Sequence, residues 1–84
     1  MENEMVSSDR VDTTLFESSL LREGTYFHGT KVMRLTFQNG TTREYRGVER
    51  AQWVELSEVA DSPGRYFNQC IRPFFTAHKV EGYD

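Results

Sequence analysis

The sequence lacks the two features that build disulfide-linked and membrane-anchored proteins, which are paired cysteines and a long apolar run. It contains one cysteine, Cys70, so an internal disulfide is excluded, and a lone thiol is typical of a reducing compartment. No stretch approaches the roughly 20 consecutive apolar residues that span a membrane. The chain starts with acidic residues and no apolar run, which argues against a secretory signal. We therefore expect a cytoplasmic protein.

The spacings that catalytic and metal sites require are also missing. There is no glycine-rich loop followed by lysine that would cradle a phosphate. His28 and His78 have no cysteine or carboxylate at the spacing of metal ligands. Cys70 falls on the apolar side of a predicted helix, where a thiol packs as a small hydrophobe. We predict no catalytic residue, no metal, no cofactor and no enzyme activity.

Charge is modest and unevenly distributed. The formal net charge is −3, yet residues 1–19 carry five acidic side chains against one basic, whereas residues 20–80 carry nine basic against six acidic. A strong nucleic-acid binder usually has a clearer basic excess. We interpret residues 1–14 as a mobile acidic leader with a short ordered piece near Val11, residues 15–80 as one domain, and residues 81–84 as a tail.

An alternation of apolar and polar residues over 32–37 predicts a β-strand with one buried face, formed by Met33, Leu35 and Phe37. Residues 38–40, Gln-Asn-Gly, are a turn signal, and a second short strand follows as far as Tyr45. This hairpin is the element around which we expect the rest to pack.

The length of the hairpin loop decides which side chains are buried. A two-residue loop would put Glu44 on the apolar face and turn Tyr45 to solvent. A three-residue loop, residues 38–40, shifts the register by one, faces Tyr45 toward Met33 and lays the stem of Arg43 beside Leu35. Burial therefore favours the three-residue loop, with Gly40 in a left-handed conformation.

The segment before the hairpin is harder to interpret. The apolar cluster of residues 15–21 fits either a strand or one helical turn, because periodicity cannot separate the two over so short a stretch. Residues 23–25, Glu-Gly-Thr, are predicted to break it. A short strand is expected over residues 26–28 and a turn over residues 28–31.

Two helices are predicted after the hairpin. Over residues 49–60, Trp53, Leu56, Val59 and Ala60 recur with helical spacing and make one apolar face. A second helix is expected from Pro63 to about residue 71, with Ser62 as N-cap and Pro63 at the first helical position.

The second helix has its own apolar stripe, formed by Phe67, Cys70, Ile71 and Phe74. Pro73 disfavours helix at the residue before it and ends the element. Phe74 and the next phenylalanine are expected to fold back on the core, and residues from 78 onward to form a tail. The order of elements predicts an α+β domain: a small antiparallel meander of three to four strands, followed by a two-helix hairpin packed on one face.

A set of positions spread over about residues 18–80 forms a recognisable pattern: Ser18, Ser19, Tyr26, Phe37, Asn39, Gly40, Val48, Ser62, Gly64, Phe67, Asn68, Ile71 and Phe74. With this pattern the sequence resembles the KTSC domain family, which occurs at the C-terminus of some lysyl-tRNA synthetases and as stand-alone bacterial and phage proteins. The resemblance implies a bacterial cell or a phage-infected host cell as the setting. In the family's central Tyr-x-Tyr motif the first aromatic is replaced here by Arg43.

Most of the remaining positions are assigned to the fold. Asn68, in a Phe-Asn pair near the helix start, is expected to hydrogen-bond loop backbone and fix the turn. The residues predicted to be structural are Phe37, Gly40, Tyr45, Trp53, Ser62, Pro63, Phe67, Asn68 and Ile71.

The candidate binding residues are four arginines and one tyrosine: Arg43, Arg46, Arg65, Tyr66 and Arg72. Arg65 and Arg72 are seven positions apart and share one side of the second helix. Such a patch suits RNA, with Tyr66 stacking on a base, or an acidic protein surface; alternatively the arginine stems only cover a thin core. We expect a non-catalytic adaptor or inhibitor that docks on a protein partner, a host factor if the chain is phage-encoded, with RNA binding as the alternative.

Overall fold

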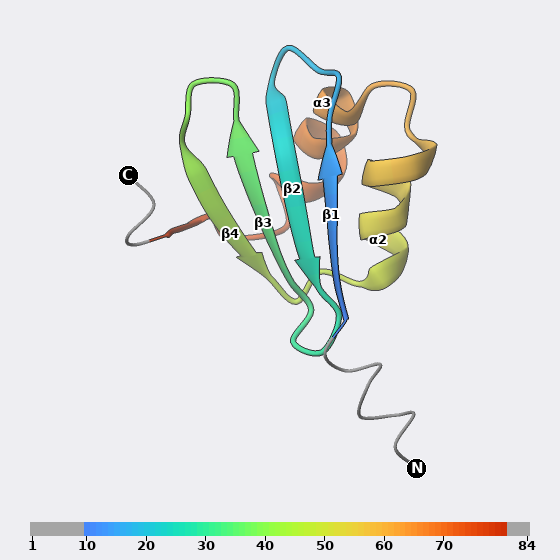
Figure 1. Cartoon of the computed structure of the whole chain (residues 1–84), viewed down its shortest axis with the longest axis vertical. Helices are drawn as coiled ribbons and strands as arrows, with labels where there is room; N and C mark the ends of the chain where they lie inside the picture. The colour runs from blue at the N-terminus through green and yellow to red at the C-terminus, as the bar shows by residue number, and fades with distance from the viewer. Residues whose placement is uncertain (1–9, 81–84) are drawn as a thin grey trace.

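Five antiparallel strands in sequential order form one sheet in the computed structural model, which describes residues 10–80. Two helical segments lie on one side of this sheet (Figure 1). The predicted α+β architecture, with a meander followed by a helical pair on one face, is confirmed. The strands are β1 (Val11–Leu15), β2 (Leu21–Phe27), β3 (Val32–Phe37), β4 (Thr42–Arg46) and β5 (His78–Lys79).

The hairpin between β3 and β4 has the predicted three-residue loop. Met33 pairs with Tyr45 across the two strands, and both side chains are buried. Two backbone hydrogen bonds close the loop: the Phe37 N–H donates to the Thr41 carbonyl at 2.8 Å, and the Gly40 N–H donates to the Phe37 carbonyl at 2.9 Å. Gly40 has a φ of 90°, a conformation that favours glycine. The register and the loop length predicted from burial are therefore confirmed.

The predicted leader boundary is wrong, because β1 begins at Val11 and pairs with β2 along its whole length. The ordered piece expected near Val11 is this strand, whereas residues 1–9 lie outside the described residues. β1 ends at Leu15, which is 77% exposed, and Phe16 then enters the core with 8% exposure. The apolar cluster of residues 15–21 is thus the end of one strand, a loop and the start of the next.

Residues 23–25 do not break the chain as predicted but continue β2, with a register irregularity between Leu21 and Glu23. The glycine in this run, Gly24, is needed for close packing. A β-carbon there would lie 2.9 Å from Leu35 Cδ2 and 3.2 Å from Trp53 Cζ3. Gly24 therefore marks a close approach between the sheet and the helix layer rather than a turn.

The first helix begins as α2 (Arg50–Val54) and continues as a π-helical turn, η1 (Glu55–Val59). Trp53 and Leu56 are buried as predicted, but Val59 is 57% exposed. The Ala60 N–H bonds the Glu55 carbonyl at 2.8 Å, an i to i+5 pattern that widens the turn. Val59 consequently leaves the apolar face that a regular α-helix predicts.

The second helix starts as α3 (Pro63–Tyr66) and continues as another π-helical turn, η2 (Phe67–Ile71). Ser62 is the N-cap as predicted, since its hydroxyl accepts the Arg65 N–H at 3.3 Å. Gly64 packs closely against the loop after β1, because a β-carbon at Gly64 would lie 3.2 Å from Ser18 Oγ in that loop. The turn between the two helices is thereby fixed against the sheet.

Only part of the predicted apolar stripe on this helix is buried. Phe67 and Ile71 are 3% and 0% exposed, but Cys70 is half-buried and Phe74 is 73% exposed. The π-helical contact from Arg72 N to Phe67 O, at 2.9 Å, again shifts the positions that follow. Phe75 packs against the core in place of its neighbour.

The segment predicted as a C-terminal tail contributes a strand. His78 pairs with Glu44 and Lys79 with Arg43, so β5 extends the sheet beyond β4. Residues 81–84 lie outside the described residues. The core between sheet and helices consists of Phe16, Leu21, Tyr26, Met33, Leu35, Tyr45, Val48, Trp53, Leu56, Phe67 and Ile71.

Candidate binding groove

The five predicted binding residues do not form one patch. Arg46 follows the buried Tyr45 in β4, so it points to the sheet face away from the helices. There its Nε bonds Glu44 at 2.8 Å, and Arg34 bonds the same carboxylate at 3.2 Å. These two arginines hold the pKa of Glu44 below its usual value, because both hydrogen-bond its charged form. Arg46 is thus occupied within the fold.

Tyr66 is also apart from the arginines. It is half-buried and packs against the core, and burial raises the pKa of its hydroxyl. The groups that act on that hydroxyl are Cys70 and Glu55, so it lies toward the first helix. Tyr66 does not stand beside Arg43 as an open stacking surface.

Arg65 and Arg72 are both exposed on the second helix, but they line different grooves. Asn68, between them in sequence, lines both. The hydrogen bond to loop backbone that is predicted for Asn68 does not form: among residues 10–80 its side chain has no hydrogen-bond partner. The start of the helix is instead capped by the Ser62 hydroxyl, which accepts the Arg65 N–H, while the Ser18 hydroxyl accepts the N–H groups of Leu20 and Leu21 in the loop between β1 and β2.

Arg43 and Arg72 are brought together across an open groove between the β3–β4 hairpin, η2 and the segment after it. We call this the aromatic groove; its volume is about 410 Å³. Its floor is apolar because the rings of the sheet and of η2 meet there, with Phe67 edge-on to Phe37 at 5.4 Å and to Tyr45 at 5.6 Å. The lining residues are Leu20, Phe37, Asn39, Thr41, Arg43, Tyr45, Phe67, Asn68, Arg72, Phe75 and Ala77.

The aromatic groove is electropositive. No aspartate or glutamate lines it, and within residues 10–80 neither Arg43 nor Arg72 has a carboxylate partner. Arg43 donates one hydrogen bond, to the Thr42 carbonyl at 3.1 Å, which leaves its other donors available. Lys79 pairs with Arg43 across β4 and β5, so a third cation lies next to the groove, although outside its lining.

A second groove, about 640 Å³, lies at the start of the second helix. Its wall includes Arg65, but Glu17 and Asp61 line it as well. The serine hydroxyls of Ser18 and Ser62 there already accept backbone N–H groups. This groove is larger, but acidic and basic side chains are mixed on its wall, so its charge favours neither an anion nor a cation.

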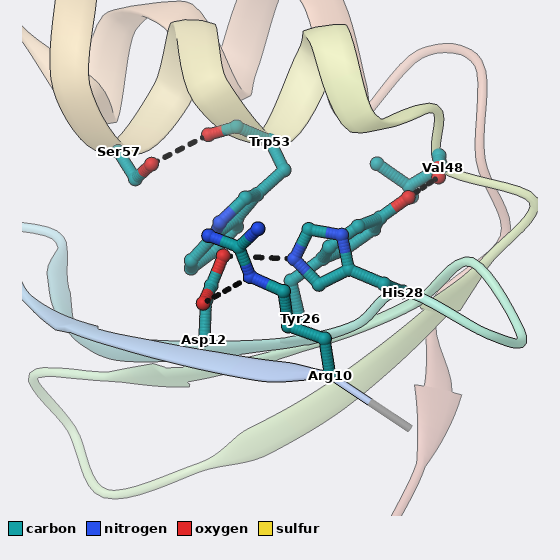
Figure 2. Close-up of polar contacts among 7 residues, drawn as sticks. All are labelled: Arg10, Asp12, Tyr26, His28, Val48, Trp53 and Ser57. Carbon is teal, nitrogen blue, oxygen red and sulfur yellow. Dashed lines mark hydrogen bonds and ion pairs between the residues drawn. The ribbon is translucent and has the colours of Figure 1, made fainter. Parts of the chain in front are cut away.

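A polar cluster that the sequence pattern does not reveal lies where β1 meets the end of β2 (Figure 2). His28 Nε2 bonds Asp12 at 2.8 Å, and Arg10 lies 3.4 Å from the same carboxylate. The His28 hydrogen bond is the largest effect lowering the pKa of Asp12. The His28 ring packs edge-on to Tyr26 at 4.8 Å. Because the partners are 16 residues apart, only the strand pairing reveals this contact, which fastens β1 to the sheet.

Residues 10–80 contain no group of three or more histidine, cysteine, aspartate or glutamate residues that would hold a metal ion. Among the same residues, no helix has the length and apolar character needed to cross a membrane.

The fold and the groove define a small α+β domain with an open, electropositive recess beside its central hairpin. The chain belongs to the KTSC domain family, whose model matches residues 17–75. This match begins after β1. Among solved structures, a KTSC domain protein from Yersinia pestis superposes with a TM-score of 0.75 and is 24% identical, covering 84% of this chain and 99% of that one. At that identity the likeness shows the fold. No curated protein matches the sequence.

Proposed function

We propose that the protein is a non-catalytic binding module that docks on a protein partner through the aromatic groove. The observation that carries the proposal is the pair Arg43 and Arg72, which flank an apolar floor and have no carboxylate partner among residues 10–80. A floor of this kind takes an apolar side chain of the partner, and the guanidinium groups take acidic residues around it. A cytoplasmic location agrees with the single cysteine.

RNA is the less favoured partner. Stacking of bases requires open ring faces, but Tyr45 and Phe67 are each only 3% exposed and pack against one another. The arginines that RNA phosphates would contact are spread over two grooves and the opposite sheet face. Specific observations therefore favour a protein with an acidic surface.

The test compares capture by three forms of the full chain. The wild type, the double variant Arg43→Gln/Arg72→Gln and the control Arg46→Gln are immobilised, and bound proteins are identified by mass spectrometry. The control loses one arginine whose partner lies on the other sheet face. We expect a stoichiometric protein with the wild type and the control but not with the double variant.

Recovery of no stoichiometric protein, or equal recovery by all three forms, contradicts the proposal. RNA binding is examined in parallel by filter binding at two salt concentrations. An RNA affinity that falls steeply with salt and is lost in the double variant would assign the groove to RNA instead.

A further inference from the structure

We propose that the floor of the aromatic groove holds an oxyanion site, formed by the Tyr45 hydroxyl, Arg43 and Arg72, that binds the carboxylate of an aspartate or glutamate of the partner. The inference rests on the proposed function and deepens it, since it names the chemical group that the groove recognises.

The Tyr45 side chain is the most informative part of this site. It is 97% buried, being 3% exposed, yet its hydroxyl has no hydrogen-bond partner among residues 10–80. In the same residues every fully inaccessible side-chain nitrogen or oxygen has a partner. The Tyr45 oxygen must therefore be accessible to solvent, and it is accessible through the aromatic groove, which Tyr45 lines. An unused donor at the base of a recess is available to a ligand.

A comparison with Tyr26 shows that the unused hydroxyl is specific to Tyr45. Both rings are buried in the same core, but Tyr26 donates to the Val48 carbonyl at 2.6 Å. Within the fold, phenylalanine would serve as well as tyrosine at position 45, so the hydroxyl is useful only for binding a ligand.

Both guanidinium groups act on this hydroxyl. Burial raises the pKa of Tyr45, whereas the charges of Arg43 and Arg72 lower it, so both cations lie within electrostatic range of the phenol oxygen. A phenol and two arginines provide several donors and two positive charges, and no carboxylate lines the groove to compete for them. Carboxylates match this set because arginine binds them through two parallel hydrogen bonds.

A carboxylate from a protein is favoured over a nucleic-acid phosphate by the surroundings of the site. The groove floor beside Tyr45 is apolar and includes Phe37, Phe67 and Phe75. Two asparagines, Asn39 and Asn68, present amide groups at the rim of the groove. The Asn68 side chain has no partner in residues 10–80, and the Asn39 oxygen already accepts the Thr41 N–H at 2.9 Å. Carboxamides hydrogen-bond readily to an extended peptide backbone, so the rim suits a peptide segment with an acidic residue.

The test uses a blocked tetraglutamate peptide as the probe and the full chain, labelled with ¹⁵N, as the receptor. Backbone amide shifts are followed during titration for the wild type, Tyr45→Phe, Arg72→Gln and the control Arg46→Gln. Blocked tetraglutamine, inorganic phosphate and an oligouridylate are titrated separately. Arg72 is exposed, so its variant keeps the test valid even if a change at Tyr45 disturbs the core.

We expect saturable shifts at the amides of residues 43, 45 and 72 with tetraglutamate and none with tetraglutamine. Affinity should fall about tenfold in Tyr45→Phe, the loss of one hydrogen bond to a charged group, and at least as much in Arg72→Gln. It should be unchanged in Arg46→Gln.

Equal affinity of the wild type and Tyr45→Phe overturns the inference, as does saturation of the same amides by phosphate or oligouridylate but not by tetraglutamate. If a partner is captured through Arg43 and Arg72 but tetraglutamate does not bind as expected, the docking function is retained and the oxyanion site is rejected. If tetraglutamate binds as expected but no partner protein is recovered, only the proposed function fails.

Discussion

The two buried tyrosines give a sharp prediction about stability. Replacing Tyr26 with phenylalanine removes a 2.6 Å hydrogen bond and leaves the carbonyl of Val48, a fully buried residue, without its donor. Leaving a buried acceptor unpaired costs about 1–3 kcal/mol. For a domain of this size each kcal/mol lowers Tm by about 4–8 °C. The same change at Tyr45 removes a hydroxyl with no partner in residues 10–80, so we expect a change within about 0.5 kcal/mol.

Urea denaturation followed by tryptophan fluorescence measures both variants. Trp53 is the single tryptophan, and it stacks on Tyr26 with ring centroids 5.7 Å apart, so its emission reports on the core directly (Figure 2). Equal destabilisation by Tyr26→Phe and Tyr45→Phe would refute the reasoning, because it would mean that the Tyr45 hydroxyl also serves the fold. A Tyr26→Phe variant as stable as the wild type would refute the assignment of the Val48 contact.

Three further predictions concern the fold. Gly24→Ala should cost about 1–3 kcal/mol in urea denaturation, because the added carbon lies 2.9 Å from Leu35 Cδ2 in a filled core. Leu56→Ala should cost about 2–5 kcal/mol and Val59→Ala within about 0.5 kcal/mol, since the π-helical turn buries the first and exposes the second. Glu44→Gln should lower stability by roughly 0.5–1 kcal/mol at pH 7. The pKa of Glu44 is lowered from 4.5 in the folded state, so this difference should persist above pH 4.5 and shrink as pH falls below it, measured by denaturation at several pH values.

Much of the fold could be predicted because burial leaves few choices. The β3–β4 register followed from the need to bury Tyr45 rather than Glu44, and the helix start followed from Ser62 and Pro63. Where the structure differs in the sheet, the cause is a contact distant in sequence. Gly24 resembles a break until the helix layer above it is known.

The predictions for the ends of the helices and for the end of the chain are also wrong. A π-helical turn has no signal in a periodic pattern, so Val59 and Phe74 were assigned to the core although both are exposed. A strand of two residues such as β5 forms only because β4 is already in place.

The candidate site was only partly predictable. Arg43 and Arg72 were identified as binding residues, but sequence could not distinguish them from Arg46, whose carboxylate partner is its near neighbour in β4. Tyr45 was assigned a purely structural role because its strand pattern shows that the ring is buried but not whether the hydroxyl is bonded. Only the hydrogen bonds of the folded chain separate the two kinds of tyrosine.

The most direct measurement for the docking function is calorimetric titration of the captured partner with the wild type, Arg43→Gln/Arg72→Gln and Arg46→Gln. The groove predicts at least a hundredfold loss of affinity in the double variant, about tenfold for each charged contact, and no change in the single control. Equal affinity of all three forms would contradict it.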